Sequence, residues 1–385
     1  MEKKKLKVMT ILGTRPEIIR LSEVIKAAEK EFDHLLVHTG QNYDYELNQI
    51  FFEELGLRAP DFYLNCVGST LGETMGNVLA KVYPLLEAQK PDAVLILGDT
   101  NSALSAISAK RLKIPVFHME AGNRCWDWNV AEMTNRTIVD HIADINLPYS
   151  HFAYGNLMKE GLSPERTFIS GSPMKQVILA HKEKIEGSDV LARLGLEKGK
   201  YLVVSAHREE NVDIDSKFNQ LFPALNRIAE EFRLPVVFSV HPRTRNRMAR
   251  RGFVLSPYIR DDKPFGFFDY CKLEANAYCV LSDSGTLTEE SSILDFPGVL
   301  IRTSTERQEG VLHGSIVIGG VTYDSIRKAI GEARDIHKEG NTLPIVPDYD
   351  VDDVSTMVIE TIKKYIDVIN KETWLKGVPD DIVKI

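Results

Sequence analysis

The chain has 385 residues, which favours two domains over one, and its 43% hydrophobic and 26% charged residues are typical of globular proteins that bury a core. The formal net charge of −8 argues against a general nucleic-acid binder and against a membrane-surface binder. The four cysteines form no C-x-x-C pair, so we expect reduced thiols, no zinc site and no disulfide framework. There is no run of about 18 apolar residues and no signal-peptide pattern, so we expect no membrane span and a cytoplasmic location.

Strand and helix patterns alternate along the first half of the chain. Helical spacing of apolar residues predicts helices at 16–30 and 102–112. Alternation of this kind is typical of a parallel sheet with helices on both faces. Short apolar runs predict strands at 6–13, 34–40, 93–99, 115–121, 145–148 and 167–171.

The pattern restarts in the second half, after a mostly helical, charged stretch at 173–199. An amphipathic pattern predicts a last helix at 354–370. Gly171 and Pro173 interrupt the periodicity, so we place the hinge there. Apolar runs predict strands at 201–205, 235–240, 277–281 and 299–302, with helices between them.

These patterns predict an α/β protein with two doubly wound, Rossmann-like domains that face each other across a cleft, in a glycosyltransferase-B-like arrangement. We expect an N-terminal domain at 1–171 and a C-terminal domain at 172–355. We expect the remaining helix and tail, 356–385, to pack back on the N-terminal domain.

Turns rich in glycine, hydroxyl and charged side chains follow the predicted strands of both halves. In parallel α/β sheets, ligands bind at the carboxyl ends of the strands, so these turns would face one cleft. No single turn is decisive, but together they indicate an enzyme acting on a phosphorylated, sugar-like ligand. The turns are 13–17, 98–101, 120–124, 205–210, 241–243 and 282–286.

Two of these turns are candidates for binding an anion. Gly13 opens a helix whose first N–H groups, together with Arg15, would hold a phosphate. The small residues 284–286 would let the backbone approach a phosphate, and Glu290 would accept ribose hydroxyls. Both turns are equally consistent with a structural role, as a βα turn with a surface arginine and as a helix N-cap followed by dipole-favoured glutamates.

Four residues are candidates for chemistry. Asp99 and Glu120 end neighbouring apolar strands, and Glu132 follows in a loop that contains two tryptophans. Two carboxylates on opposite sides of a ring carbon can remove a proton from one face and return one to the other. His207 ends the first strand of the second domain, where it would meet a phosphate. A surface or capping role is the alternative for each residue alone, and His118, inside a strand, is expected to be a core histidine.

The ordered motifs resemble the non-hydrolysing UDP-N-acetylglucosamine 2-epimerase family from about residue 6 to residue 375. The branch that forms UDP-N-acetyl-L-fucosamine is the most similar, on the stretches 41–48, 206–212 and 241–247. The family motifs are matched at 13–17 (GTRPE), 98–100 (GDT), 118–124 (HMEAGNR), 171–174 (GSPM), 205–211 (SAHREEN), 282–285 (SDSG) and 305–307 (TER).

The resemblance implies a reaction and a set of site residues. Family members epimerise C2 of a UDP-2-acetamido sugar by eliminating UDP and adding it back, without a nicotinamide cofactor or a metal ion. By motif, Asp99, Glu120 and Glu132 match the catalytic carboxylates, and His207 matches the catalytic histidine. We expect a homodimer that binds a UDP-sugar and neither nucleic acid nor membrane. The expected substrate- and UDP-binding residues are Arg15, Arg20, Arg124, Arg136, Ser284, Gly285, Thr286, Glu290 and Arg307.

The chain departs from the similar branch in one loop. Where that branch usually has Arg-Val-Pro-Glu-Glu, this chain keeps Glu132 but has Asn129, Ala131 and Met133 around it. Gln308 stands where a proline usually follows Glu-Arg. Since this loop is expected to shape the sugar pocket, the identity of the sugar stays open.

Three functions of different classes remain open. The first is an isomerase that forms a UDP-6-deoxy-L-hexosamine, UDP-N-acetyl-L-fucosamine, for surface polysaccharide synthesis, with UDP-N-acetylglucosamine/UDP-N-acetylmannosamine or a UDP-diacetamido-uronic acid as alternative substrates. The second is a glycosyltransferase or a hydrolysing epimerase, because a fold does not fix a function. The third is a degenerate UDP-sugar-binding or regulatory protein, suggested by the altered stretch 129–133. Product analysis separates the first from the second, because only the first returns an intact UDP-sugar, and turnover with a panel of UDP-sugars would settle the third.

Overall fold

The computed structural model describes residues 5–40, 48–338 and 343–377. The strands of its N-terminal lobe are β1 (Lys7–Leu12), β2 (Asp33–His38), β3 (Phe62–Tyr63), β4 (Ala93–Leu97), β5 (Val116–Met119) and β6 (Ile145–Leu147). The strands of its C-terminal lobe are β7 (Leu202–Ser205), β8 (Val236–Ser239), β9 (Ile259–Asp262), β10 (Cys279–Ser282), β11 (Gly298–Leu300) and β12 (Ile316–Ile318).

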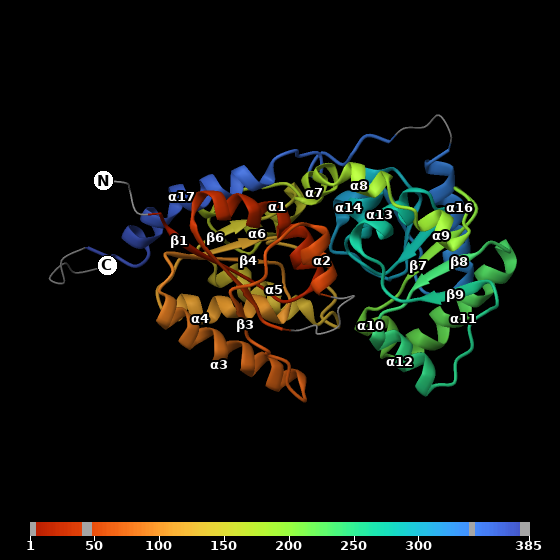
Figure 1. Ribbon diagram of the computed structural model, residues 1–385, viewed down its shortest axis with the longest axis horizontal. Helices are drawn as coiled ribbons and strands as arrows, with labels where there is room; N and C mark the ends of the chain where they lie inside the picture. Colours follow the sequence, from red (N-terminus) through yellow and green to blue (C-terminus); the bar gives the residue numbers. More distant parts are fainter. Residues whose placement is uncertain (1–4, 41–47, 339–342, 378–385) are drawn as a thin grey trace.

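Within the described ranges these strands form two parallel six-stranded sheets, one in each lobe (Figure 1). The first sheet has the order β3-β2-β1-β4-β5-β6, and the second has the order β12-β11-β10-β7-β8-β9. Numbered from its own first strand, each sheet has the 3-2-1-4-5-6 order of a Rossmann domain. The prediction of an α/β protein with two doubly wound, Rossmann-like domains is therefore confirmed.

Helices cover the sheets, connect the lobes and close the chain. The N-terminal lobe has α1 (Arg15–Glu31), α2 (Gln49–Glu54), α3 (Leu71–Gln89), α4 (Ser105–Arg111), α5 (Glu132–Ile142) and α6 (His151–Lys159). The connecting helices are α7 (Met174–Ala180) and α8 (Lys182–Glu186). The C-terminal lobe has α9 (Val190–Leu194), α10 (Glu209–Val212), α11 (Asp215–Phe232), α12 (Pro242–Arg250), α13 (Phe267–Ala275), α14 (Leu287–Leu294), α15 (Gln308–Leu312) and α16 (Tyr323–Ile336), and α17 (Val354–Glu372) follows.

The central strands form because their sequences are continuously apolar. β4 reads Ala-Val-Leu-Ile-Leu and is buried over its whole length, as a strand covered by helices on both faces must be. β1 pairs with β4, and β7 pairs with β10, although each pair is far apart in sequence. These two pairs are the topological switch points of the lobes, where Rossmann folds bind ligands. The turns after these four strands are therefore the places to look for a site.

The last helix, α17, returns to the N-terminal lobe. Its buried residues recur every three or four positions and join one hydrophobic cluster with Leu21 and Ile25 of α1. Figure 1 shows α17, in blue, beside α1. The amphipathic helix predicted at 354–370 is thus present. The exact domain boundaries, at 171 and 355, stay a prediction.

One predicted strand, 167–171, is not formed. This segment pairs with the sheet at a single bridge, between Asn146 and Thr167. The residue after β6 is Pro148, which has no N–H to donate, so the ladder does not extend. The chain then turns at Gly171, whose φ of +75° favours glycine. The short strands β3, β9 and β12 were not predicted from the sequence.

The helices of the described part of the chain include none that combines the length and apolarity needed to cross a bilayer. In those same ranges, no three His, Cys, Asp or Glu side chains gather in a way that would hold a metal ion.

Candidate active site

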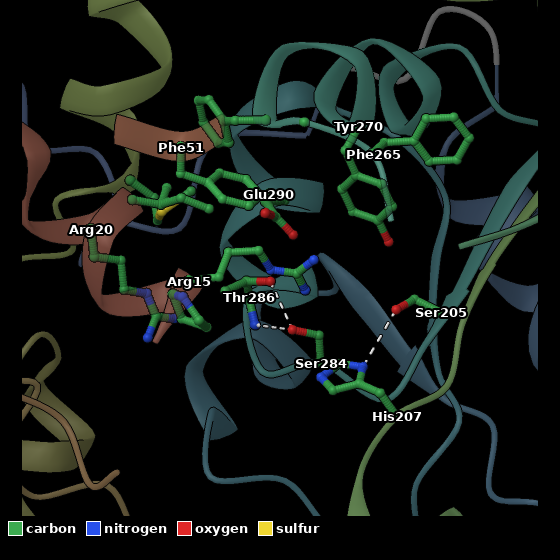
Figure 2. A pocket seen from close by; sticks show the side chains of 15 residues that line it. Arg15, Arg20, Phe51, Ser205, His207, Phe265, Tyr270, Ser284, Thr286 and Glu290 are labelled. Carbon is green, nitrogen blue, oxygen red and sulfur yellow. Dashed lines mark hydrogen bonds between the residues drawn. The ribbon is translucent and has the colours of Figure 1, made fainter. Parts of the chain in front are cut away.

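A pocket of about 590 Å³ opens between the lobes, beside the turns that follow β1, β7 and β10 (Figure 2). This volume includes space that is open to solvent. Residues of both lobes and of α7 line it, so a ligand there would contact both halves of the chain. The lining residues are Arg15, Pro16, Ile19, Arg20, Phe51, Met174, Ser205, His207, Phe265, Gly266, Phe267, Tyr270, Ser284, Thr286 and Glu290.

One end of the pocket has the features of an anion site. Figure 2 shows Arg15 extending from α1 toward the turn that carries Ser284 and Thr286, whose hydroxyl oxygens lie 2.9 Å apart. The helix α14 begins directly after this turn, so backbone N–H groups without helical partners face the same space. A Cβ at Gly285 would lie 3.0 Å from a carboxylate oxygen of Glu306, which favours glycine there. These groups suit a phosphate or diphosphate.

The other end of the pocket is aromatic. Phe265 and Tyr270 form one wall, and Glu290 points into the space beside Tyr270 (Figure 2). Burial raises the pKa of Glu290, and the neighbouring charge of Glu289 raises it further. Aromatic side chains offer flat apolar surface, and a carboxylate accepts hydrogen bonds from hydroxyls. This end therefore suits a nucleoside.

Glu17 explains why the turn after β1 has its particular sequence. Its carboxylate accepts hydrogen bonds from the N–H of Gly13 (3.1 Å) and from the hydroxyls of Thr14 (2.8 Å) and Thr100 (3.1 Å). Burial raises the pKa of Glu17 to about 7, although these hydrogen bonds lower it. The residue therefore joins the turn after β1 to the turn after β4. Glu17 thus fixes the position of the candidate anion site relative to the turn that carries Asp99.

Glu120 lies at the centre of a charged cluster between the lobes. Its backbone φ is +62°, an uncommon value for a residue with a Cβ and one that is found at functional sites. Arg20 of the N-terminal lobe contacts its carboxylate at 2.5 Å, and Arg307 of the C-terminal lobe contacts it at 2.6 Å. The fully buried Glu289 binds the same two guanidinium groups, at 2.6 and 3.3 Å. Arg20 also lines the pocket, so the Arg20 side chain alone lies between Glu120 and the pocket.

The other two carboxylates also have arginine partners. Asp99 contacts Arg136 at 2.5 Å, and Glu132 contacts Arg208 of the opposite lobe at 3.0 Å. Glu132 is the first residue of α5, not part of a loop as the sequence analysis expected. Arg208 reaches a second carboxylate, Glu306, at 3.5 Å. An arginine from the C-terminal lobe thus fixes each of Glu120 and Glu132.

His207 enters the pocket from the C-terminal lobe. Its Nδ1 lies 3.2 Å from Asp283, which also accepts the backbone N–H groups of His207 and Arg208. Burial alone would raise the pKa of Asp283, but the charge of His207 and these hydrogen bonds lower it to about 2. A carboxylate on one ring nitrogen leaves the other to face a ligand. His207 is therefore placed to contact an anion in the pocket.

Arg124 is not brought to the pocket. Its side chain is fully buried and contacts Asp140 at 2.7 Å and Glu160 at 2.7 Å. Asp140 also binds His118, which in turn contacts the carbonyl of Gly98, so His118 is the core histidine that we expected. The predicted ligand role of Arg124 does not agree with these contacts, because its hydrogen-bonding groups are directed to carboxylates behind the turn.

Two other predicted arginines, Arg136 and Arg307, do not line the pocket and instead hold Asp99 and Glu120. Sequence reasoning missed Glu289, Arg208 and Asp140 as site residues. Glu289 and Arg208 could have been found from the sequence, because they adjoin the predicted site residues Glu290 and His207.

Comparison with known proteins places the chain in a family. A model of the family described as UDP-N-acetylglucosamine 2-epimerase matches residues 25–363. The chain belongs to this family. The prediction of an enzyme, a non-hydrolysing UDP-N-acetylhexosamine 2-epimerase, is confirmed at this level. The comparisons do not single out the branch that forms UDP-N-acetyl-L-fucosamine, and residues 41–47 of one branch-like stretch lie outside the described residues.

Three similar proteins describe this family relationship in more detail. The structure of UDP-N-acetylglucosamine 2-epimerase from Rickettsia bellii is 44% identical, with a TM-score of 0.88 over 97% of this chain and 100% of that chain. The Methanocaldococcus jannaschii UDP-GlcNAc 2-epimerase, in complex with UDP-GlcNAc and UDP, is 32% identical, with a TM-score of 0.87 over 93% and 100%. A Pseudomonas aeruginosa relative named UDP-2,3-diacetamido-2,3-dideoxy-D-glucuronate 2-epimerase is 33% identical over 83% of this chain and 90% of that protein.

Proposed function

We propose that the protein epimerises C2 of a UDP-2-acetamido sugar by eliminating UDP and adding it back. A carboxylate takes the C2 proton, the C1–O bond to UDP breaks with its electron pair on UDP, and a C1–C2 double bond forms. UDP then attacks C1, and a carboxylic acid returns a proton to the other face of C2. The proton and the UDP lost in the elimination are both added back, so the reaction has no net change in oxidation state and consumes no cofactor.

One arrangement supports this proposal most directly. Arg20 lines the pocket and contacts Glu120, while His207 lines the pocket from the opposite lobe. Glu132 is held by Arg208, the residue next to His207. The diphosphate site and the carboxylates are thus neighbours, as an elimination across C1 and C2 requires.

The roles follow from this placement. Glu120 and Glu132 exchange the C2 proton, and Asp99, fixed by Arg136, assists them. His207 and Arg15 stabilise the negative charge that UDP gains as it leaves. Enclosure between the lobes keeps water from the glycal.

The reaction predicts a specific isotope pattern. Incubation with a panel of UDP-2-acetamido sugars in deuterated water should give an epimeric UDP-sugar that carries deuterium at C2, measured by NMR. An epimerised product with full retention of the C2 hydrogen would contradict proton exchange. Free UDP as the final product would instead indicate a hydrolysing enzyme or a transferase.

For the sugar, we infer a 6-deoxy-L-hexosamine, so that the product is UDP-N-acetyl-L-fucosamine. Trp126 and Trp128, which precede Glu132 in the sequence, are 57% and 65% exposed and offer apolar surface for a C6 methyl group. Asn129, which is exposed, stands where the similar branch has a cation, so a substrate carboxylate beside it would lack that ion-pair partner. Met133 is fully buried and does not add to this surface.

A UDP-diacetamido-uronic acid is the second candidate, because the Pseudomonas aeruginosa relative carries that name. Initial rates on both sugars discriminate, in the native chain and in a variant with Asn129→Arg and Ala131→Pro. We expect the native chain to be faster on the 6-deoxy sugar and the variant to shift toward the uronic acid. Faster turnover of the uronic acid by the native chain would refute the apolar-loop argument.

We also infer a cytoplasmic homodimer that acts in the synthesis of a surface polysaccharide such as capsule or O-antigen. Exposed apolar side chains on and beside α3, namely Leu71, Tyr83 and Val67, offer surface for a second copy. Light scattering after size-exclusion chromatography measures the assembly, and a monomeric mass for the native chain would contradict it.

A further inference from the structure

The aromatic wall of the pocket is held from the opposite lobe. Phe265, Gly266 and Phe267 line the pocket at the start of α13, in the C-terminal lobe. Glu54, the last residue of α2 in the N-terminal lobe, accepts a hydrogen bond from the N–H of Phe267 at 2.6 Å and another from the N–H of Phe268. A carboxylate at this position satisfies N–H groups that have no helical partner and favours the helix dipole. α2 thus caps a helix that belongs to the other lobe.

Gly266 leaves room for this contact. A Cβ at Gly266 would lie 2.0 Å from Oε1 of Glu54, far inside contact distance. The φ of Gly266 is −64°, a value open to any residue, so its backbone conformation does not require glycine. Glycine is required here because the carboxylate of Glu54 approaches so closely that a Cβ would not fit.

Apolar packing joins the same two helices. Phe51 and Leu55 beside Glu54 share a buried cluster with Phe267 of α13. Leu273, farther along α13, belongs instead to a core cluster of the C-terminal lobe. α13 therefore packs against both lobes. Glu54 contacts the first residue of α13, which is the end of this helix that lines the pocket.

We propose that Glu54 is a positioning residue, which sets the aromatic wall of the nucleotide pocket when the two lobes close. The inference rests on the proposed UDP site and adds a residue to it. Glu54 is not among the residues that line the pocket, so it acts through α13. Closure that forms these hydrogen bonds raises the fraction of molecules competent to bind nucleotide, and apparent affinity scales with that fraction.

Calorimetry with UDP tests this inference. Glu54→Ala should raise the Kd for UDP about tenfold or more, the scale for losing a hydrogen bond to a charged group. Glu54→Gln keeps an acceptor oxygen and should stay within about threefold of the native Kd. Glu53→Ala, on the exposed side of α2, is the matched control and should bind as the native chain does. Equal affinity of the Glu54→Ala and native chains would overturn the inference.

Kinetics separate positioning from a general structural loss. Because Glu54 touches no reacting atom, Glu54→Ala should raise KM about tenfold and change kcat by less than about threefold. A fall in kcat at constant KM would contradict the inference. If the native chain itself binds no UDP, the proposed function fails first, and this inference fails with it.

A double-mutant cycle provides a second, independent test. Gly266→Ala should displace the Glu54 carboxylate and weaken UDP binding about as much as Glu54→Ala. The double variant should be no worse than either single variant, because the contact is already lost in each. Additive losses would show that Gly266 acts on the pocket without Glu54, and the inference would be wrong.

Discussion

Replacing Arg124 by methionine decides between the two roles that sequence and structure give to this residue. In the structure its guanidinium contacts Asp140 at 2.7 Å and Glu160 at 2.7 Å, and its side chain is fully buried. Methionine fills similar volume without a charge. The carboxylate of Asp140, also fully buried, then keeps His118 at 3.0 Å and the N–H of Gly122 at 3.2 Å.

The magnitude follows from these remaining contacts. Removing one partner of a buried ion pair costs about 3–5 kcal/mol, because the other charge stays buried. Asp140 retains a histidine and a backbone donor, and Glu160 is partly exposed, so we expect the lower end, about 3 kcal/mol. Arg124→Met combined with Asp140→Asn should recover part of this loss, since no unpaired charge is left in the core.

Tryptophan fluorescence during urea unfolding measures this effect. The three tryptophans, Trp126, Trp128 and Trp374, all lie in the N-terminal lobe or pack against its core, so they report on the lobe that holds Arg124. Arg111→Met, at an exposed position at the end of α4, is the control. UDP affinity is measured on the same variants. If Arg124→Met kept the stability of the native chain but lost much of its affinity for UDP, the reasoning would be refuted, and Arg124 would be a ligand-binding residue.

The remaining predictions concern the pocket and the carboxylates. Arg15→Ala should weaken UDP binding by about 1.5–3 kcal/mol, the range for a hydrogen bond to a charged group, and unchanged affinity in calorimetry would move the diphosphate elsewhere. Glu120→Gln and Glu132→Gln should each keep UDP binding but slow epimerisation roughly 100-fold or more, so near-normal turnover would remove that residue from the mechanism. Asp283→Asn tests pH dependence. Folding lowers the pKa of Asp283 to about 2, so its contribution, roughly 2–3 kcal/mol, is present above pH 4 and is lost as pH falls toward 2. The stability difference between the native chain and Asp283→Asn should shrink over that interval, and a constant difference would contradict the assignment.

The fold was predictable where sequence signals are long or repeated. β4 is five continuous apolar residues, and α17 repeats its buried positions over 19 residues, so both were found. β3 has two residues and β12 has three, too few to show a period. The segment 167–171 has the composition of a strand, but Pro148 on its neighbour ends the pairing, and sequence alone does not show which neighbour a strand meets.

The site was predictable where a residue directly follows a strand. His207 and Arg15 follow β7 and β1, and the switch-point rule places them together. The role of Glu289 was not predictable, because its partner Arg20 is 269 residues away in the sequence. The ligand role of Arg124 stays a prediction: an arginine in a turn fits an anion and a buried carboxylate equally well, and in the structure Arg124 contacts Asp140 and Glu160.

Two ion pairs of the site join the two lobes. Arg307 holds Glu120 and Arg208 holds Glu132, and in both pairs the arginine is on the lobe opposite the carboxylate. If the lobes separate, these pairs break and their four charged groups can be hydrated again, so separation need not leave a buried, unpaired charge. In the proposed function, closure of the lobes on UDP would form the same two ion pairs and bring the carboxylates into position. The proposed function therefore predicts that nucleotide binding is coupled to placement of the proton-transfer groups, so that a glycal formed between closed lobes would meet UDP before it met water.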